Sequence, residues 1–159
     1  MSGELLGHLY SHLYGIRFVA LRFFTVYGPR QRPDLAIHRF ARLMREGARL
    51  PLYGDGATRR DYTYVDDIVD GIVGAVEYSQ AQYVVINLGN NRTVSLLELV
   101  RLLQDVLGVK ARVDYLPEQP GDVPCTWAST AKAERLLGYR PRVSIEEGLQ
   151  LFAEWLDTV

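Results

Sequence analysis

Residues 22–33 read Arg-Phe-Phe-Thr-Val-Tyr-Gly-Pro-Arg-Gln-Arg-Pro, and the apolar run Ile-Arg-Phe-Val-Ala-Leu at residues 16–21 comes directly before them. The length and composition of that run predict a buried strand. The strand must end by Gly28-Pro29, because proline cannot donate to a β-ladder and glycine permits a tight turn. The end of the strand and the loop after it therefore carry one hydroxyl, two aromatic rings and two guanidiniums: Thr25, Phe24, Tyr27, Arg30 and Arg32.

This strand end is a candidate ligand site. In open α/β sheets, ligands bind at the carboxyl ends of parallel strands. A guanidinium is a planar fork of donors that suits a carboxylate or a phosphate. A well-packed strand end with solvated arginines explains the same residues equally well, so both interpretations stay open on this chemistry alone.

The composition limits the class of protein. The chain has 159 residues, which suits one domain or one lobe of a larger one, and its 48% apolar and 23% charged residues are typical of a soluble globular protein. A net charge of −1 gives no reason to expect nucleic acid or an anionic membrane as partner. The single cysteine, Cys125, excludes an internal disulfide and fits a cytoplasmic location.

Hydrophobic periodicity predicts an α/β fold. We expect helices over residues 3–14, 34–46, 66–78, 95–108, 129–137 and 144–156, and strands over 16–21, 50–53, 59–64, 83–87 and 111–115, with 117–124 irregular. Ser95 and Ser144 each precede a glutamate by three residues, which is the pattern of a capping box. Strands 16–21 and 83–87 are apolar throughout, as in a parallel sheet covered on both faces. The short elements near 50–65 and 111–138 are expected to form a small cap lobe.

Neither a nucleophile nor a metal site stands out. The chain has no Gly-x-Ser-x-Gly and no Gly-x-Gly-x-x-Gly motif, and His8 and His12 form an i, i+4 pair without an evident third ligand. The remaining candidates are polar residues in turns: Thr25, Arg30, Arg32, Arg59, Arg60, Gln119 and Asp122. Gathered in one cleft they could hold a diphosphate and a sugar, whereas separately they would be surface or salt-bridge residues.

Four stretches together resemble a known family. They are residues 21–34, residues 51–56 (Pro-Leu-Tyr-Gly-Asp-Gly), residues 59–68 (Arg-Arg-Asp-Tyr-Thr-Tyr-Val-Asp-Asp-Ile) and residues 119–124 (Gln-Pro-Gly-Asp-Val-Pro). The chain is similar to extended short-chain dehydrogenase/reductases of the NAD-dependent epimerase/dehydratase family, and most like UDP-glucuronate 4-epimerases, from about Gly3 to Leu156. The resemblance implies the C-terminal part of an extended Rossmann-type, NAD(P)-binding fold, with parallel strands and a small substrate-binding cap lobe.

The resemblance covers only the second half of the family's enzyme. The family's glycine fingerprint, catalytic Ser or Thr and Tyr-x-x-x-Lys do not occur here, since Val106 and Ala128 stand four residues before the only lysines, Lys110 and Lys132. We therefore expect residues 1–159 to be the C-terminal substrate-binding half, either a truncated gene product or an expressed fragment, without the NAD-binding half. The family epimerises C4 of a nucleotide sugar through a 4-keto intermediate with NAD, and this chain alone is expected to be inactive and not to bind NAD.

The resemblance also assigns roles to residues. It implies that Phe24 lies near the nicotinamide, Thr25 contacts the substrate, Arg32 meets the carboxylate of the sugar, Tyr53 lies at the uracil and Arg60 grips the diphosphate, while Gln119 and Asp122 reach the phosphate and ribose. No catalytic residue and no metal ligand is implied. The helix at residues 3–14 resembles the family's dimerisation helix, so a homodimer is expected besides the UDP-sugar partner.

Three other interpretations stay open at this point. The chain could derive from a dehydratase or decarboxylase of the same family. It could be a non-catalytic module that binds a UDP-sugar or docks on a full-length partner. It could also be a gene remnant without function.

Overall fold

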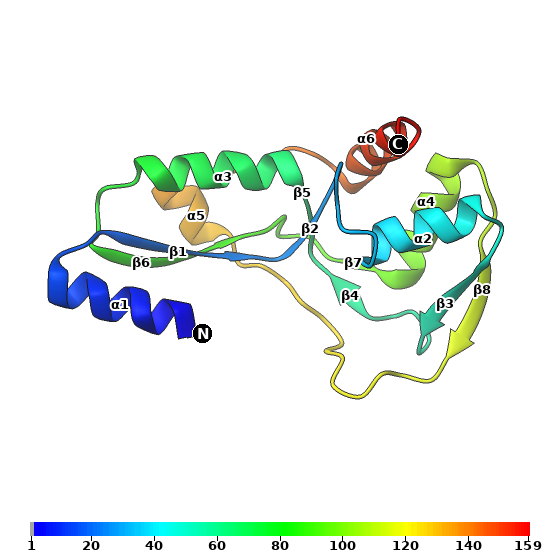
Figure 1. Ribbon diagram of the computed structural model, residues 1–159, viewed down its shortest axis with the longest axis horizontal. Coiled ribbons are helices and arrows are strands. Elements are labelled where there is room, and N and C mark those ends of the chain that lie inside the picture. The colour runs from blue at the N-terminus through cyan, green and yellow to red at the C-terminus, as the bar shows by residue number, and fades with distance from the viewer. Residues whose placement is uncertain (1) are drawn as a thin grey trace.

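The computed structural model describes residues 2–159 and is elongated, with two groups of elements joined near their middle (Figure 1). The first group, called the sheet lobe here, comprises α1 (Ser2–Tyr14), β1 (Phe18–Phe23), α3 (Val65–Glu77), β6 (Tyr83–Leu88) and α5 (Ala131–Leu137). The second group, called the cap lobe, comprises β2 (Thr25–Tyr27), α2 (Ala36–Arg45), β3 (Arg49–Tyr53), β4 (Arg59–Arg60), β5 (Tyr62–Tyr64), β7 (Val94–Ser95), α4 (Leu96–Leu107), β8 (Arg112–Leu116) and α6 (Ile145–Leu156).

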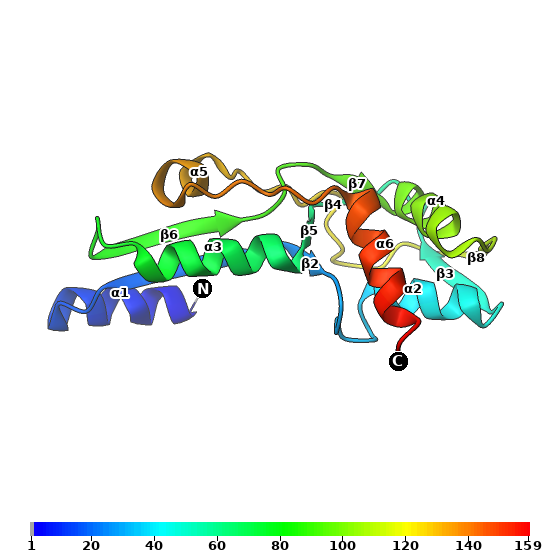
Figure 2. The ribbon, with the colours of Figure 1, turned by 90° about the horizontal axis from the view of Figure 1, so that it is seen from above.

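The sheet lobe confirms that the two apolar strands belong to a parallel sheet, but β1 is buried only in part, at Ala20. β1 runs parallel to β6, in a register from Phe18 opposite Tyr83 to Phe23 opposite Leu88. Helix α1 covers one face of this pair, and α3 and α5 cover the other (Figures 1 and 2). β1 begins two residues later than predicted, because Gly15, in a left-handed conformation with φ of 66°, ends α1 and the next residues connect it to the strand.

Helix α1 contacts the sheet through its small residues. Gly7 and Ser11 are its buried positions, and a Cβ on Gly7 would lie 2.3 Å from the ring of Phe18. The apolar stripe visible in the sequence points away from the sheet, with exposed fractions of 48–69%. Its members are Leu5, Leu6, Leu9, Tyr10, Leu13 and Tyr14. The helix thus presents an apolar face that the described residues leave uncovered.

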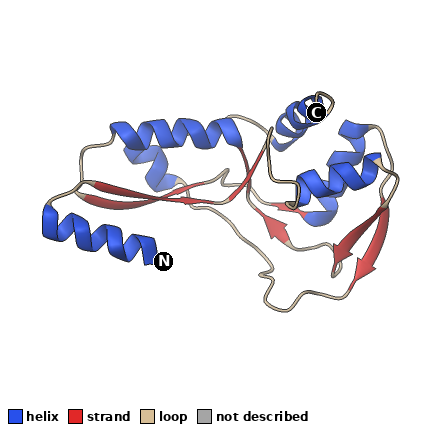
Figure 3. Ribbon diagram, in the orientation of Figure 1, coloured by secondary structure: helices blue, strands red, loops and turns tan. Residues whose placement is uncertain are grey.

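The cap lobe encloses the larger of the two hydrophobic clusters. Helices α2, α4 and α6 contribute Phe40, Leu99, Leu103 and Phe152 to this cluster, all at most 5% exposed. The strands form parallel pairs β2–β5 and β3–β8 and one antiparallel pair, β4–β7 (Figure 3).

One element predicted for the cap lobe belongs to the sheet lobe instead. The segment 129–138 contains α5, which packs against β6 and α3. Ala133 and Tyr139 are buried there in one cluster with Leu88. The prediction of its position was wrong because the apolar residues of so short a helix do not reveal which core they enter.

The two expected capping boxes differ in the structure. At α4, the Ser95 hydroxyl accepts the Glu98 N–H and the Glu98 carboxylate accepts the Ser95 N–H, which completes the box. At α6, the Ser144 hydroxyl accepts the Glu147 N–H at 3.1 Å. Only this half of the box is formed at α6, so the second prediction was correct for the cap and wrong for the reciprocal bond.

The strand predicted for residues 59–64 is divided at Asp61. Its side chain is fully buried, and its carboxylate accepts the N–H groups of Asn90, Asn91 and Ala128 at 2.7–3.1 Å and the hydroxyl of Thr63 at 3.1 Å. Before Asp61, β4 pairs with β7; after it, β5 pairs with β2. Asp61 therefore fixes the crossing of three segments: the β4–β5 junction, the turn after β6 and the segment that leads to α5.

We predict that Asp61→Asn lowers the free energy of unfolding by about 3 kcal/mol, because an amide places an N–H₂ group against N–H donors and removes the charge that they stabilise. Urea unfolding followed by circular dichroism measures the change. Asp105→Asn, on the exposed side of α4, is the matched control and should stay within about 0.5 kcal/mol of the wild type. A loss below about 1 kcal/mol for Asp61→Asn would contradict the assigned role.

Candidate functional site

The cap lobe contains a cavity of about 280 Å³ that brings four sequence-predicted site residues together. They are Thr25 from β2, Tyr53 at the end of β3, Arg60 from β4, and Asp122 from the irregular segment 117–124. Phe40, Pro51 and Tyr62 add apolar and aromatic walls. The cavity therefore combines a cation, a carboxylate and a hydroxyl with flat ring surfaces.

Arg60 is held in position at this cavity. Its guanidinium forms an ion pair with Asp122, and its Nη1 donates to the carbonyl oxygen of Arg59 at 2.8 Å. The side chain of Arg60 is 21% exposed, against 43% for Asp122. The pair joins segment 117–124 to β4 across the cavity.

Gln119 lies in an adjoining hollow of about 270 Å³ rather than in the cavity itself. Tyr53, Thr58 and Asp122 line both spaces. The Asp122 N–H donates to the Gln119 carbonyl oxygen at 3.1 Å, so the two residues belong to one turn. Gln119 is thus next to the site, on the far side of Asp122.

Arg32 lies in a different hollow, together with Arg30 and Gly28. Its side chain is 73% exposed and its nearest carboxylate is that of Asp34, at 3.4 Å. Gln31 lines both this hollow and the cavity, so it stands between them. The structure does not place Arg32 or Arg30 among the residues that line the cavity.

Two other candidates are also outside the cavity. Phe24 connects β1 to β2, and its N–H donates to the Leu88 carbonyl oxygen at 3.2 Å. Arg59 donates to the hydroxyl and the carbonyl oxygen of Thr93 at 2.9 and 2.7 Å. Arg59 therefore holds the segment before β7, which is a structural role.

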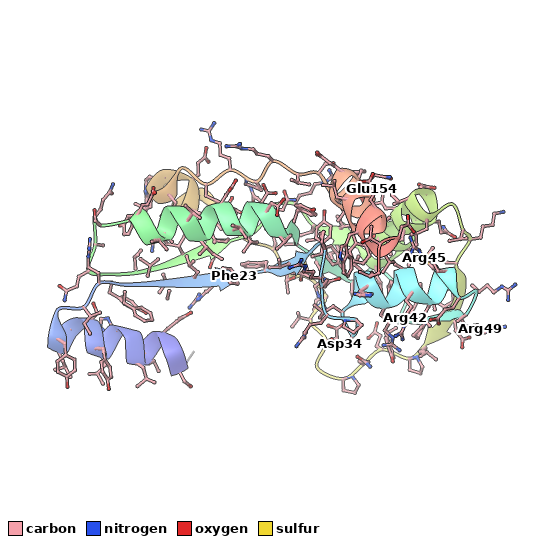
Figure 4. All side chains as sticks on the ribbon, turned by 45° about the horizontal axis from the view of Figure 1, so that its top comes forward. Phe23, Asp34, Arg42, Arg45, Arg49 and Glu154 are labelled. Carbon is pink, nitrogen blue, oxygen red and sulfur yellow. The ribbon has the colours of Figure 1, made fainter. Side chains whose placement is uncertain are left out.

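The four arginines that follow the predicted site loop have separate tasks. Figure 4 labels three of them, Arg42, Arg45 and Arg49. Arg45 donates to the Leu156 carbonyl oxygen at 3.1 Å and pairs with Asp157, which caps α6. Arg42 pairs with Glu46 and Arg49 with Asp114, at 3.7 and 3.5 Å. Arg39 alone lines the cavity. The sequence analysis missed it because its spacing places it on the same polar side of the helix as the others.

The beginning of α2 forms part of the cavity wall. Leu35 occupies the N-cap position and makes no side-chain capping bond, and Ala36 and Ile37 line the cavity. The first N–H groups of a helix lack intrahelical acceptors, and this end of a helix carries a partial positive charge. This wall therefore combines the positive end of a helix and Arg39 with the carboxylate of Asp34.

The histidines of α1 do not form a metal site with other residues. His8 packs edge-on against Tyr83, with ring centroids 4.8 Å apart. Within residues 2–159, no three His, Cys, Asp or Glu side chains gather as ligands of one ion. A search of the same residues for a helix both long and apolar enough to cross a bilayer finds none.

Burial raises the pKa of the Tyr62 phenol to about 12, although the charge of Arg60 acts in the opposite direction. Burial also raises the pKa of Tyr27, and nearby Tyr64, Asp67 and two glutamates add to that shift. The phenol of Tyr62 is therefore neutral at physiological pH, and at this cavity wall it is a hydrogen-bonding and stacking surface rather than a base.

The fold and the cavity define a class of protein. A parallel strand pair with helices on both faces, followed by a cap lobe around a polar cavity, matches the C-terminal part of the Rossmann-like epimerase structures within the extended short-chain dehydrogenase/reductases. The family model described as GDP-mannose 4,6 dehydratase matches residues 1–152. The chain belongs to this family.

Individual relatives agree with this assignment. A UDP-glucuronate 4-epimerase of Thermodesulfobacterium geofontis is 40% identical over 97% of this chain and 47% of its own length. The structure of UDP-glucuronic acid 4-epimerase from Bacillus cereus, in complex with UDP-glucuronic acid and NAD, is 41% identical with a TM-score of 0.91, over 99% of this chain and 50% of that one. The structure of UDP-glucose 4-epimerase from Thermotoga maritima, solved with UDP-glucose, is 34% identical with a TM-score of 0.93, over 99% of this chain and 51% of that one.

The share of each relative that this chain covers also bears on its function. The chain spans about half the length of the curated relatives it matches. The activities of those relatives belong to proteins twice as long.

We predict an alkaline loss of stability to which Tyr62 contributes. Its folded-state pKa of about 12 exceeds the usual value of 10.0, so above pH 10 the unfolded chain releases this proton first. The free energy of unfolding should then fall by about 1.4 kcal/mol per pH unit for this group, and Tyr62→Phe should remove that contribution.

Urea unfolding of both proteins between pH 8 and pH 11 measures the two slopes. Tyr115→Phe is the control for loss of a tyrosine, because Tyr115 is 62% exposed and meets similar solvent in both states. Identical slopes for the wild type and Tyr62→Phe would show that the phenol is not buried as described.

Proposed function

We propose that this chain provides the UDP-sugar-binding half of an NAD-dependent nucleotide-sugar 4-epimerase of the UDP-glucuronate 4-epimerase type. The single observation that carries the proposal is the convergence of Thr25, Tyr53, Arg60 and Asp122 on one cavity. These residues come from four separate stretches, and each stretch belongs to a motif of the resemblance.

The chemistry of the cavity suits such a ligand. In the proposed complex, the ring of Tyr53 lies against the uracil, and Arg60 donates to the diphosphate. Asp122 holds Arg60 in place and, with Gln119 behind it, faces the ribose side. Thr25, the first residue of β2, contacts the sugar. A charge-assisted hydrogen bond, such as the one from Arg60 to the diphosphate, contributes about 1.5–3 kcal/mol.

The chemical step needs groups that these residues do not supply. The 159 residues contain no Tyr-x-x-x-Lys and no glycine fingerprint. Phe24, the one residue assigned to the nicotinamide, lies outside the cavity and offers no phosphate contact. The residues present therefore do not fit NAD by themselves, and we propose that this chain neither binds NAD nor epimerises a sugar alone.

We expect the isolated chain to bind UDP-glucuronate and to leave it unchanged when NAD is added. Calorimetry measures the binding and chromatography of the sugar products measures turnover. Arg60→Gln should weaken binding by about fivefold, because it removes a charged donor to phosphate whose pairing with Asp122 offsets part of its contribution. Arg140→Gln, which removes an exposed arginine paired with Glu134 on the sheet lobe, is the matched control.

Epimerisation by the pure chain would contradict the proposed inactivity, and absence of binding would contradict the proposed site. The same titration tests the sugar. We propose that Arg32 reaches a uronate carboxylate from the hollow that it shares with Arg30 and Gly28. Arg32→Gln should therefore weaken the binding of UDP-glucuronate more than the binding of UDP-glucose. Equal losses of affinity for both sugar nucleotides would contradict the role of Arg32 and favour a neutral sugar as substrate. Analysis of the products formed by a full-length relative separates an epimerase from a dehydratase or decarboxylase.

The uncovered face of α1 favours a second role, docking on another copy of the chain. Six large apolar side chains there are 48–69% exposed. We predict that the chain forms a homodimer through α1 and that Leu6→Glu with Leu13→Glu shifts it toward monomer, because each buried carboxylate would cost several kcal/mol. Light scattering after size-exclusion chromatography measures the mass.

Val159→Glu is the control for this experiment, since Val159 is also strongly exposed, at 80%, but lies at the opposite end of the chain. A monomeric wild type at high concentration would refute a dimer through α1.

A further inference from the structure

We propose that Arg39 is the residue that receives the phosphate charge of the ligand in the cap-lobe cavity, with Arg60 in a secondary role. This inference rests on the proposed function and names the residue that controls affinity for the anionic part of the ligand. None of the motifs that carry the family resemblance contains Arg39.

The charges around the cavity support this assignment. Four charged side chains line it: Asp34, Arg39, Arg60 and Asp122. Asp122 is paired with Arg60, and Asp34 faces Arg32 in the next hollow. The guanidinium of Arg39 makes neither an ion pair nor a hydrogen bond with any other side chain or carbonyl oxygen of residues 2–159. Arg39 is thus the cation whose donors are available to an incoming anion.

Arg60 differs in this respect. Any anion that approaches it must compete with Asp122, and one of its nitrogens already donates to the Arg59 carbonyl oxygen. Breaking an existing partly buried pair offsets much of what a new pair contributes. Arg39 is exposed and has no such partner within residues 2–159, so an anion that binds it displaces only water. We therefore infer that a phosphate gains more from Arg39 than from Arg60.

The surroundings of Arg39 indicate the kind of anion. The cavity wall beside it is apolar and aromatic, with Phe40, Pro51, Tyr53 and Tyr62. In a ligand that joins a ring system to a phosphate, the rings can pack against the apolar and aromatic wall and the phosphate can accept from Arg39. The guanidinium presents paired donors that match phosphate oxygens. The ligand class is therefore a nucleoside diphosphate rather than a free sugar acid.

Helix α2 offers its own matched control. Arg42 lies three residues after Arg39, its side chain is 56% exposed, and it pairs with Glu46 outside the cavity. Arg39→Gln and Arg42→Gln therefore make the same chemical change on neighbouring turns of one helix. They differ in that Arg39 lines the cavity, whereas Arg42 lies outside it and pairs with Glu46.

The experiment titrates the full chain with UDP and, separately, with inorganic pyrophosphate by calorimetry. We expect Arg39→Gln to weaken UDP binding by about 10-fold or more and Arg42→Gln to stay within about twofold. Arg39→Lys keeps the charge but loses the fork, so it should recover part of the loss. Thermal unfolding of each variant confirms that the fold is intact.

The outcomes separate this inference from the proposed function. UDP binding that is unaffected by Arg39→Gln overturns the role of Arg39 and leaves the proposed function standing. Pyrophosphate binding that requires Arg39, in a chain that does not bind UDP, supports the role of Arg39 and overturns the proposed function. A wild-type chain that binds neither probe overturns both.

Discussion

The carboxylate of Asp61 is the contact on which the arrangement of the two lobes depends. It is a fully buried carboxylate whose partners within residues 2–159 are three backbone N–H groups and one hydroxyl, not a cation. A buried charge is tolerated only when hydrogen bonds replace its water, and this one draws those bonds from segments that begin or end in different lobes. Satisfying one side chain therefore fixes where the chain leaves β6, where it enters α5, and where β4 ends.

The cavity follows from that constraint. Arg60 and Tyr62 flank Asp61 in the chain, and both line the cavity while Asp61 itself is buried behind them. Successive residues of an extended chain point to opposite sides, so a carboxylate anchored inward turns its two neighbours outward together. The site residues of β4 and β5 are thus positioned by a residue that contacts no ligand in the proposed complex.

The sequence predicted the elements well and their surroundings less well. The parallel pairing of β1 and β6 and the box at Ser95 were predictable because periodicity and capping are local signals. The place of α5 was not, since an apolar residue does not say which core it enters. The outward direction of the α1 stripe follows from the resemblance to a dimerisation helix and not from periodicity. Asp61 was overlooked because, in the sequence, a buried acceptor of backbone bonds looks like any turn aspartate.

The same distinction explains which candidate site residues converge. Thr25 begins β2, whereas Tyr53 and Arg60 end β3 and β4, and the topology brings these three strand termini to one cavity. Arg32 follows a turn in which Gly28 and Arg30 have φ of 143° and 64°, and a Cβ on Gly28 would lie 2.7 Å from Val65. This turn redirects the chain before Arg32 is reached, so adjacency in the motif does not become adjacency in space. Arg39 returns to the cavity because α2 begins at its wall, which makes the helix, rather than the arginine-rich loop, the cationic side of the site.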